Sequence, residues 1–324
     1  MTDSPLILAV PSKGRLQENA TAFFARAGLV FTQSRGARDY RGTLAGVPNV
    51  EVAFLSASEI VNQLATGAAH LGVTGEDLVR EQIADADATV EMLTPLGFGH
   101  ANVVVAVPQA WIDVRSMADL DEVAADIRAR HGYKMRVATK YVNLTRRFFA
   151  EHGIADYRIV ESLGATEGAP GAGSAELIVD ITTTGATLTA NALKVLDDGV
   201  MLRSEANLVA SVRASWSPAA RDAATTVLTR IAAEEEARNS REIRAALDPA
   251  RVAGLAAILQ DFGATLPFGE PEGRETVIHC KASTAFEIVA GLQNLGARNI
   301  SVRAFDYLFG SSNALTERLL RRLG

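Results

Sequence analysis

Residues 177–188 read LIVDITTTGATL, an apolar run followed by an acid, three threonines and a glycine. The apolar run predicts a buried strand, and the pattern after Gly185 predicts a helix. Glycine lets backbone approach a ligand, the first amides of a helix lack internal partners, and threonine hydroxyls can donate to phosphate oxygens. This segment therefore predicts a strand, a phosphate loop and a helix. The predicted phosphate loop consists of Thr182, Thr183, Thr184, Gly185, Ala186 and Thr187.

Asp180 stands at the carboxyl end of that predicted strand. An acid in this position can accept hydrogen bonds from a ribose diol, as the acid of a dinucleotide fold does. The alternative is that Asp180 is a solvated strand end and Thr184 only caps a helix. The strand context and the nearby acid together favour the phosphate interpretation.

Similar units recur along the chain. A strand at residues 6–10 precedes a loop at 11–15 and a helix that ends near Gly28. A strand at 71–73 leads to Thr-Gly-Glu-Asp and another helix, and the apolar run 101–107 predicts a buried strand. Alternation of strands and helices predicts an α/β fold with a mainly parallel sheet.

The C-terminal third has a different pattern. Residues 218–247 are rich in alanine and charge, and they predict a long connecting helix. The βαββαβ order that follows is typical of a ferredoxin-like domain. Its first strand competes with a continued helix, because residues 244–247 have helical propensity. The patterns predict strands at 242–247, 264–268, 276–281 and 299–305, helices at 251–260 and 284–295, and a tail helix at 313–323.

Composition narrows the class of protein. A chain of 324 residues predicts two or three domains, and 48% hydrophobic with 22% charged residues excludes a disordered chain. A formal charge of −6 argues against a general nucleic-acid binder. Residues 1–10 show no leader pattern, no apolar run reaches 18 residues, and the single cysteine, Cys280, excludes an intramolecular disulfide. We therefore expect a cytoplasmic protein with no membrane or nucleic-acid partner.

The loop at residues 11–15 places Lys13 and Arg15 beside a predicted helix start. Two cations there could hold a triphosphate or pyrophosphate, or they could be ordinary surface charges. A second anion loop in the chain favours ligand binding, since both loops could line one cleft between lobes. Glu76 and Asp77 begin another helix, where acids complement the dipole. The five histidines are scattered, so no protein-held metal site is predicted.

A family resemblance rests on these motifs. Residues 177–188 resemble the phosphoribosyl-diphosphate loop of phosphoribosyltransferases, but Val179 replaces the first of the two acids in the common type. The single-acid pattern D-x-x-x-T-G-x-T-L is similar to that of ATP phosphoribosyltransferases of histidine biosynthesis. Four other stretches match that family in order: PSKGRL at 11–16, LGVTGEDL at 71–78, VATKY at 137–141 and EGAP at 167–170. One departure is Gly171, which stands where relatives often have a basic residue.

The resemblance implies a fold. We expect two α/β lobes of the type II periplasmic-binding-protein kind around a cleft, followed by a ferredoxin-like, ACT-like regulatory domain, as in the long form of the family. The expected boundaries are residues 1–105 and 195–225 for lobe I, 106–194 for lobe II, and 226–324 for the connecting segment and regulatory domain.

It also implies a reaction. ATP and phosphoribosyl diphosphate would give N1-(5-phosphoribosyl)-ATP and diphosphate, with Mg²⁺ arriving largely with the diphosphate. Histidine would act as a feedback inhibitor, and the chain would form dimers that assemble into hexamers. The implied catalytic residues are Asp180, Glu167 and Arg15; the nucleotide contacts are Lys13, Gly14, Arg15, Gly75, Glu76 and Asp77; the effector contacts are Ser283 and Thr284.

Three alternatives stay open on sequence alone. A phosphoribosyltransferase for another base would share the loop. A two-lobed solute-binding module would share the fold but would normally carry an export signal. A non-catalytic regulatory subunit is the third alternative, and the intact loop and basic motif disfavour it.

Overall fold

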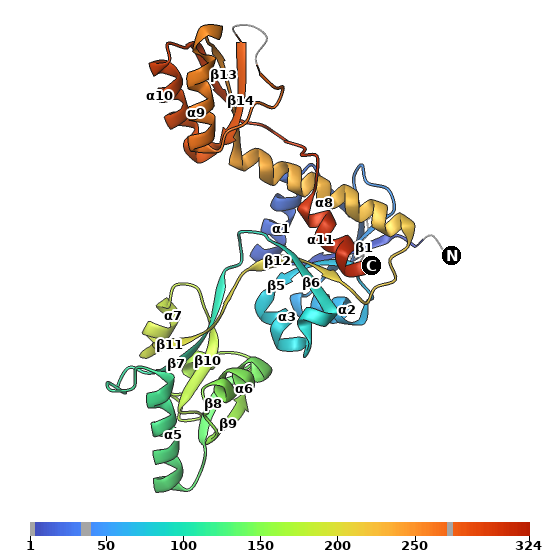
Figure 1. The fold of residues 1–324 in the computed structure, drawn as a ribbon. Coiled ribbons are helices and arrows are strands. Elements are labelled where there is room, and N and C mark those ends of the chain that lie inside the picture. The colour runs from blue at the N-terminus through green and yellow to red at the C-terminus, as the bar shows by residue number, and fades with distance from the viewer. Residues whose placement is uncertain (1–3, 34–39, 271–274) are drawn as a thin grey trace.

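The computed structural model describes residues 4–33, 40–270 and 275–324, which form three sheets with their helices (Figure 1). The largest sheet has seven strands in the order β2-β3-β4-β1-β5-β12-β6. β1 pairs in parallel with β4 and β5, and the flanking pairs are antiparallel. Its strands are β1 (Leu6–Pro11), β2 (Phe31–Gln33), β3 (Arg41–Leu44), β4 (Val50–Leu55), β5 (Leu71–Gly75), β6 (Val90–Pro95) and β12 (Ala206–Ser211).

Both faces of this sheet are covered, because apolar residues alternate in direction along β1. Leu6 and Leu8 enter a core with α1, α8 and α11, whereas Ala9 enters a second core with α2, α3 and α4. Sheet and helices together form lobe I. Its helices are α1 (Gly14–Arg26), α2 (Ala57–Thr66), α3 (Glu76–Gln82), α4 (Ala86–Thr89), α8 (Pro218–Asn239) and α11 (Ala314–Leu323).

Lobe II is built on a five-stranded sheet in the order β11-β7-β10-β8-β9. Alternate valines of β7 enter cores on opposite faces, Val103 and Val105 on one and Val104 on the other, which explains the unbroken apolar run. The elements of lobe II are β7 (Ala101–Pro108), α5 (Met117–His131), β8 (Met135–Thr139), α6 (Val142–Glu151), β9 (Tyr157–Glu161), η1 (Thr166–Gly168), β10 (Leu177–Thr182), α7 (Ala186–Ala190) and β11 (Leu193–Ser204).

The two sheets share one strand order. Apart from β2 and β3 of lobe I, the strands of the two sheets correspond one to one: β4-β1-β5-β12-β6 in lobe I and β9-β8-β10-β7-β11 in lobe II. In each sheet, the fourth strand of this order, β12 or β7, comes directly from the other lobe. This is the expected two-lobed, type II periplasmic-binding-protein architecture. Most strands of each sheet run in one direction, as expected, but β3, β12 and β7 run antiparallel to their neighbours, so both sheets are mixed.

The lobe boundaries differ from those expected at residues 105 and 195. β7 and β11 lie wholly in the sheet of lobe II, so the chain crosses between lobes at residues 96–100 and again at Glu205. The two crossings are hydrogen-bonded to each other: Ala206 N donates to Phe98 O at 2.9 Å, and Leu96 N donates to Ala206 O at 2.9 Å. Figure 1 shows these two segments running side by side between the lobes.

The small C-terminal sheet has the antiparallel order β14-β13-β15. β13 is a strand despite its helical propensity, because Ile243 and Ala245 are buried alternately with half-exposed Arg244. The strand predicted at 264–268 is reduced to one bridge, Thr265 to His279 on β14, since Pro267 has no amide to donate. This bridge occupies the edge position of the missing strand. The elements are β13 (Ser240–Ala246), η2 (Pro249–Arg251), α9 (Val252–Phe262), β14 (Glu275–Lys281), η3 (Ala282–Thr284), α10 (Ala285–Asn294) and β15 (Arg298–Arg303).

The chain end returns to lobe I. α11 packs against α8 and β6, Leu319 is only 2% exposed in the lobe I core, and Arg318 donates to Leu93 O at 2.8 Å. Ile231 of α8 belongs to the same core. The region beyond residue 226 is therefore not one unit, because its first and last helices complete lobe I while the sheet between them stands apart (Figure 1).

Candidate active site

The basic loop lies at the carboxyl end of β1. α1 begins at Gly14, whose φ of +70° is left-handed, so Arg15 belongs to the first turn of the helix. Lys13 occupies the N-cap in an extended conformation without a side-chain cap. Both cations are exposed, and neither forms a hydrogen bond or ion pair with another residue of the described chain. The loop thus presents two cations to solvent beside a helix start.

The threonine loop lies at the carboxyl end of β10, where Gly185 has a φ of +76°. The expectation of open amides is only partly met. The hydroxyl of Thr182 accepts from Gly185 N at 2.9 Å, and that of Thr184 accepts from Ala186 N at 3.4 Å. Each hydroxyl accepts in these contacts, so its own proton remains available for a phosphate oxygen.

The two loops meet the same crossing segment. Thr183 donates its hydroxyl to His100 O at 3.0 Å. On the other lobe, the side chain of Leu16, next to Arg15, lies against Gly99, because a Cβ built on Gly99 would be 3.4 Å from it. The fold therefore brings the basic loop of lobe I and the threonine loop of lobe II to adjoining residues of one crossing.

The two predicted acids are brought together in lobe II. Burial raises the pKa of Asp180, and the negative charge of Glu167 raises it further, against the Ile181 amide and the Lys140 ammonium, which lower it. The carboxylate accepts from Ile181 N at 2.8 Å. Glu167 lies in η1, which begins directly after Ala165, a residue with a left-handed φ of +51°. Two neighbouring carboxylates of this kind suit a developing positive charge or a diol.

The acids at the start of α3 behave differently from expectation. A Cβ on Gly75 would lie 2.3 Å from the carboxylate of Asp77, so the glycine makes room for that side chain. Asp77 is 7% exposed and accepts from Ser204 at 3.0 Å and from Tyr141 at 2.8 Å, which does not fit the predicted contact with a nucleotide. Glu76 is half-buried and pairs with Arg80 at 3.0 Å.

Several residues at the lobe boundary were not among the predicted ones. Lys140 is the fourth residue of the VATKY motif and directly follows β8, and its Nζ lies 5.1 Å from the Tyr141 ring centroid. Burial, with the charges of Asp77, Asp180 and Glu81, raises the pKa of the Tyr141 hydroxyl. A lysine directly after an apolar strand was a usable signal for Lys140, whereas nothing in the sequence marks Glu81.

The predicted effector residues lie at the start of α10. Thr284 holds the N-cap position, but its hydroxyl donates to Lys281 O at 3.2 Å rather than accepting a helix amide. Ser283 is exposed. The pair is far along the chain from both catalytic loops and belongs to the small C-terminal sheet domain.

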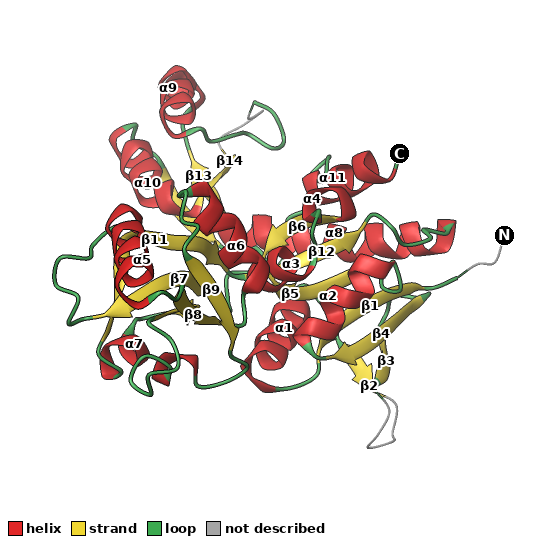
Figure 2. Ribbon diagram, turned by 90° about the horizontal axis from the view of Figure 1, so that it is seen from below, coloured by secondary structure: helices red, strands yellow, loops and turns green. Residues whose placement is uncertain are grey.

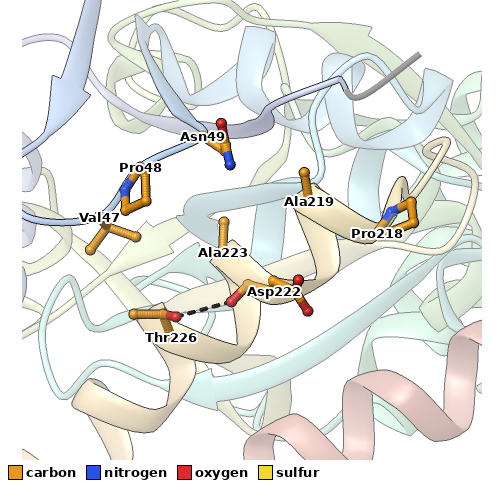
Figure 3. A pocket seen from close by; sticks show the side chains of 8 residues that line it. All are labelled: Val47, Pro48, Asn49, Pro218, Ala219, Asp222, Ala223 and Thr226. Carbon is orange, nitrogen blue, oxygen red and sulfur yellow. Dashed lines mark hydrogen bonds between the residues drawn. The ribbon is translucent and has the colours of Figure 1, made fainter. Parts of the chain in front are cut away.

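A separate pocket of about 360 Å³ lies in lobe I, between the β3–β4 turn and the start of α8 (Figure 3). It is lined by neutral side chains and one acid, Asp222, and contains none of the predicted site residues. Within residues 4–33, 40–270 and 275–324, no three His, Cys, Asp or Glu side chains are grouped as metal ligands, and no helix is long and apolar enough to span a membrane.

Two lobes with a cationic loop on one and an acid pair with a threonine loop on the other are the arrangement expected of a two-lobed phosphoribosyl-transferring enzyme. The family model of ATP phosphoribosyltransferase matches residues 56–233. The chain is 60% identical over 322 residues to the ATP phosphoribosyltransferase of Afipia carboxidovorans, covering 99% of each, and 60% identical to that of Nitrobacter winogradskyi, covering 98% of each. The chain belongs to the ATP phosphoribosyltransferase family.

A solved structure agrees on the fold. The ATP phosphoribosyl transferase (HisG:HisZ) complex from Thermotoga maritima superposes with a TM-score of 0.53 at 24% identity, covering 70% of this chain and 95% of that chain. The protein is thus a pentosyltransferase of the first step of histidine biosynthesis, with ATP and phosphoribosyl diphosphate as its substrates.

Proposed function

We propose that the transfer takes place where the basic loop and the threonine loop meet the 96–100 crossing. In this reaction the adenine N1 of ATP attacks C1 of phosphoribosyl diphosphate and diphosphate leaves. Positive charge develops on the ribose and negative charge on the leaving group, so positioning and electrostatics carry the catalysis. The observation that supports this placement best is the Asp180–Glu167 pair beside the threonine loop.

On lobe II, the carboxylates of Asp180 and Glu167 bind the ribose hydroxyls and stabilise the cationic ring. The hydroxyls and backbone of residues 182–187 bind the 5-phosphate. Because Gly171 carries no side chain, any contribution of the 168–173 loop to anion binding comes from its backbone.

On lobe I, Lys13 and Arg15 offset phosphate charge, with Gly14 allowing close approach. Gly75 and Glu76 face the nucleotide. Mg²⁺ enters with the diphosphate and neutralises its charge, and carboxylate plus phosphate oxygens are the ligand types that it prefers. No general base is assigned, since the attacking adenine nitrogen is neutral.

The small C-terminal sheet domain is the proposed regulatory part, with histidine as its effector and Ser283 and Thr284 at the effector site. A chain of this family would work in the cytoplasm as a homo-oligomer, with dimers that can assemble into hexamers. Because α11 completes the lobe I core, truncation after residue 247 would damage lobe I, so the effector site is better tested by Thr284→Val and its effect on inhibition by histidine.

The test of the catalytic assignment is diphosphate release from ATP, Mg²⁺ and phosphoribosyl diphosphate. Asp180→Ala should abolish release, and Asp121→Ala, an exposed acid on α5, should leave it unchanged. Equal release by wild type and Asp180→Ala would remove Asp180 from the site. Other purine and pyrimidine bases should give no product.

A further inference from the structure

α3 of lobe I carries two buried acids whose carboxylates bind groups of lobe II. Glu81 is 9% exposed; its Oε1 accepts from Asn143 N and its Oε2 from Leu144 N, each at 2.9 Å. Asn143 Nδ2 donates back to Glu81 O at 2.9 Å. Together with the Asp77–Tyr141 bond, these contacts join α3 to the start of α6 across the lobe boundary. Figure 2 shows the two helices next to each other between the sheets.

α6 lacks a cap of its own. Tyr141 holds its N-cap position without a side-chain cap bond, so the first amides of the helix need outside acceptors. Glu81, 62 residues earlier in the chain, supplies them from the other lobe, and its charge suits the helix dipole. α5 in the same lobe differs, because its own Ser116 and Asp119 form a capping box.

The start of α6 lies two residues after Lys140, which is next to Asp180 of the proposed active site. β8 and β10 are parallel neighbours, and their register pairs Thr139 with Val179. The next residues along the two strands are Lys140, just past the end of β8, and Asp180, still within β10, so the two lie side by side where β8 ends. Tyr141 follows Lys140 and forms the Asp77 bond, so a movement of α6 against α3 would move the lysine relative to the basic loop of lobe I.

We propose that Glu81 is a positioning residue for the transfer. By capping α6 across the lobe boundary, it holds Lys140 and Asp180 of lobe II at their working distance from Lys13 and Arg15 of lobe I. This inference rests on the proposed function of Asp180, Lys13 and Arg15, and on the Lys140 charge beside Asp180. Chemistry needs both lobes together, whereas phosphoribosyl diphosphate binds largely to lobe II. Loss of Glu81 therefore lowers kcat without a comparable rise in KM for phosphoribosyl diphosphate.

The test is Glu81→Gln, which keeps the shape of the side chain but replaces one acceptor oxygen with an amide donor. We expect kcat to fall about 10- to 100-fold, because a displacement on the order of 1 Å has effects of that size. KM for phosphoribosyl diphosphate should stay within about threefold. Hydrogen exchange of the Asn143 and Leu144 amides in the full-length protein should become faster.

Asp119→Asn is the matched control, since it removes a helix cap inside lobe II without touching lobe I, and its kcat should stay near wild type. Should Glu81→Gln fold poorly, Tyr141→Phe removes another bond across the same boundary and should shift kcat in the same direction. Wild-type kcat in Glu81→Gln, or equal losses in Glu81→Gln and Asp119→Asn, would overturn the positioning role. A wild-type chain that releases no diphosphate would overturn the proposed function and the positioning role with it, while unchanged exchange at residues 143 and 144 would overturn the cap alone.

Discussion

Lobe I and lobe II have the same strand order but carry different chemistry at equivalent strand ends. In each lobe an exposed lysine follows the strand at the equivalent position, Lys13 after β1 and Lys140 after β8. The strands β5 and β10, at equivalent positions in the two sheets, differ most. β5 leads to Asp77 and Glu81 of α3, which bind protein groups, whereas β10 carries Asp180 and leads to the threonine loop. Under the proposed function, one architecture thus supplies a lobe with a cationic loop and a lobe whose acids and threonine loop bind the phosphoribosyl group.

This difference suits a reaction between two polyanions. With a net charge of −6, the chain has no general cation excess, so the attraction of phosphate must be local. On lobe I, the exposed Lys13 and Arg15 are proposed to provide it. Lobe II needs anions near the ribose, where positive charge develops, and neutral hydroxyls near the 5-phosphate.

The largest effect is expected for Asp180→Asn, which tests whether lobe II stabilises the reacting ribose. We expect kcat/KM to fall about 10²- to 10³-fold, as for other groups that stabilise charge only in the transition state. Circular dichroism and thermal unfolding should stay near wild type, since the side chain is half-buried at a strand end. Activity within threefold of wild type would show that lobe II does not hold the reacting ring.

Lobe I alone depends on the chain end. Leu319→Ala should lower the free energy of unfolding by about 2–4 kcal/mol, because it empties a buried site in the lobe I core. Urea titration measures this, and Leu320→Ala, at an exposed neighbour of the same helix, is the control. Equal values for the two variants would mean that α11 does not complete lobe I in solution.

Arg15→Gln tests the cationic side of the comparison. Removal of one charged hydrogen-bond donor should raise KM for ATP about 10- to 100-fold, since such bonds contribute about 1.5–3 kcal/mol. Arg213→Gln, at an exposed position of the same lobe, should leave KM unchanged. If steady-state kinetics give the same KM for the two variants, Arg15 is an ordinary surface residue that does not bind substrate.

The acid pair sets a pH dependence. Burial raises the pKa of Asp180 above its ordinary value, so the acid limb of kcat/KM should lie above the limb of an exposed aspartate. Lys140 lowers that pKa, and Lys140→Met should therefore move the limb to higher pH, while Lys134→Met should not move it. If the acid limb of kcat/KM stays at the same pH in Lys140→Met, the lysine does not influence the pKa of the acid pair.

The smallest effect concerns His70, buried in lobe I; the histidines of lobe II, His131 and His152, are exposed. Its Nδ1 accepts from Ile7 N at 3.0 Å, and burial lowers its pKa. The unfolded chain therefore takes up the proton first, and the free energy of unfolding should fall as pH drops from about 6.5. Urea titrations from pH 8 to pH 5 measure this slope, which should vanish in His70→Gln.

Local pattern predicted much of the site. The β10–Gly185–α7 unit, the basic loop and the joint position of Asp180 and Glu167 all follow from strand and helix signals plus motif resemblance. The strand at 240–246 was uncertain, because alanine and arginine favour a helix locally and only burial against α9 and α10 decides for a strand.

The lobe boundary could not be predicted in the same way. The position of the crossing at residues 96–100 depends on which sheet the apolar run of β7 joins. By sequence alone, β7 could be a strand of either lobe. The Glu81 and Tyr141 contacts join residues about 60 positions apart, and neither has a local signal. Sequence also suggested a ligand role for Asp77, whose acid position at a helix start is the same whether it binds ligand or protein.

We propose that lobe II binds the phosphoribosyl group and that lobe I stabilises the negative charge of the leaving diphosphate. A crystal structure of the protein with Mg²⁺ and phosphoribosyl diphosphate tests it most directly. We expect the 5-phosphate on residues 182–187, the ribose hydroxyls on Asp180 and Glu167, and the diphosphate toward Lys13 and Arg15. A 5-phosphate seated on Lys13 and Arg15, with the ribose turned away from Asp180, would contradict it.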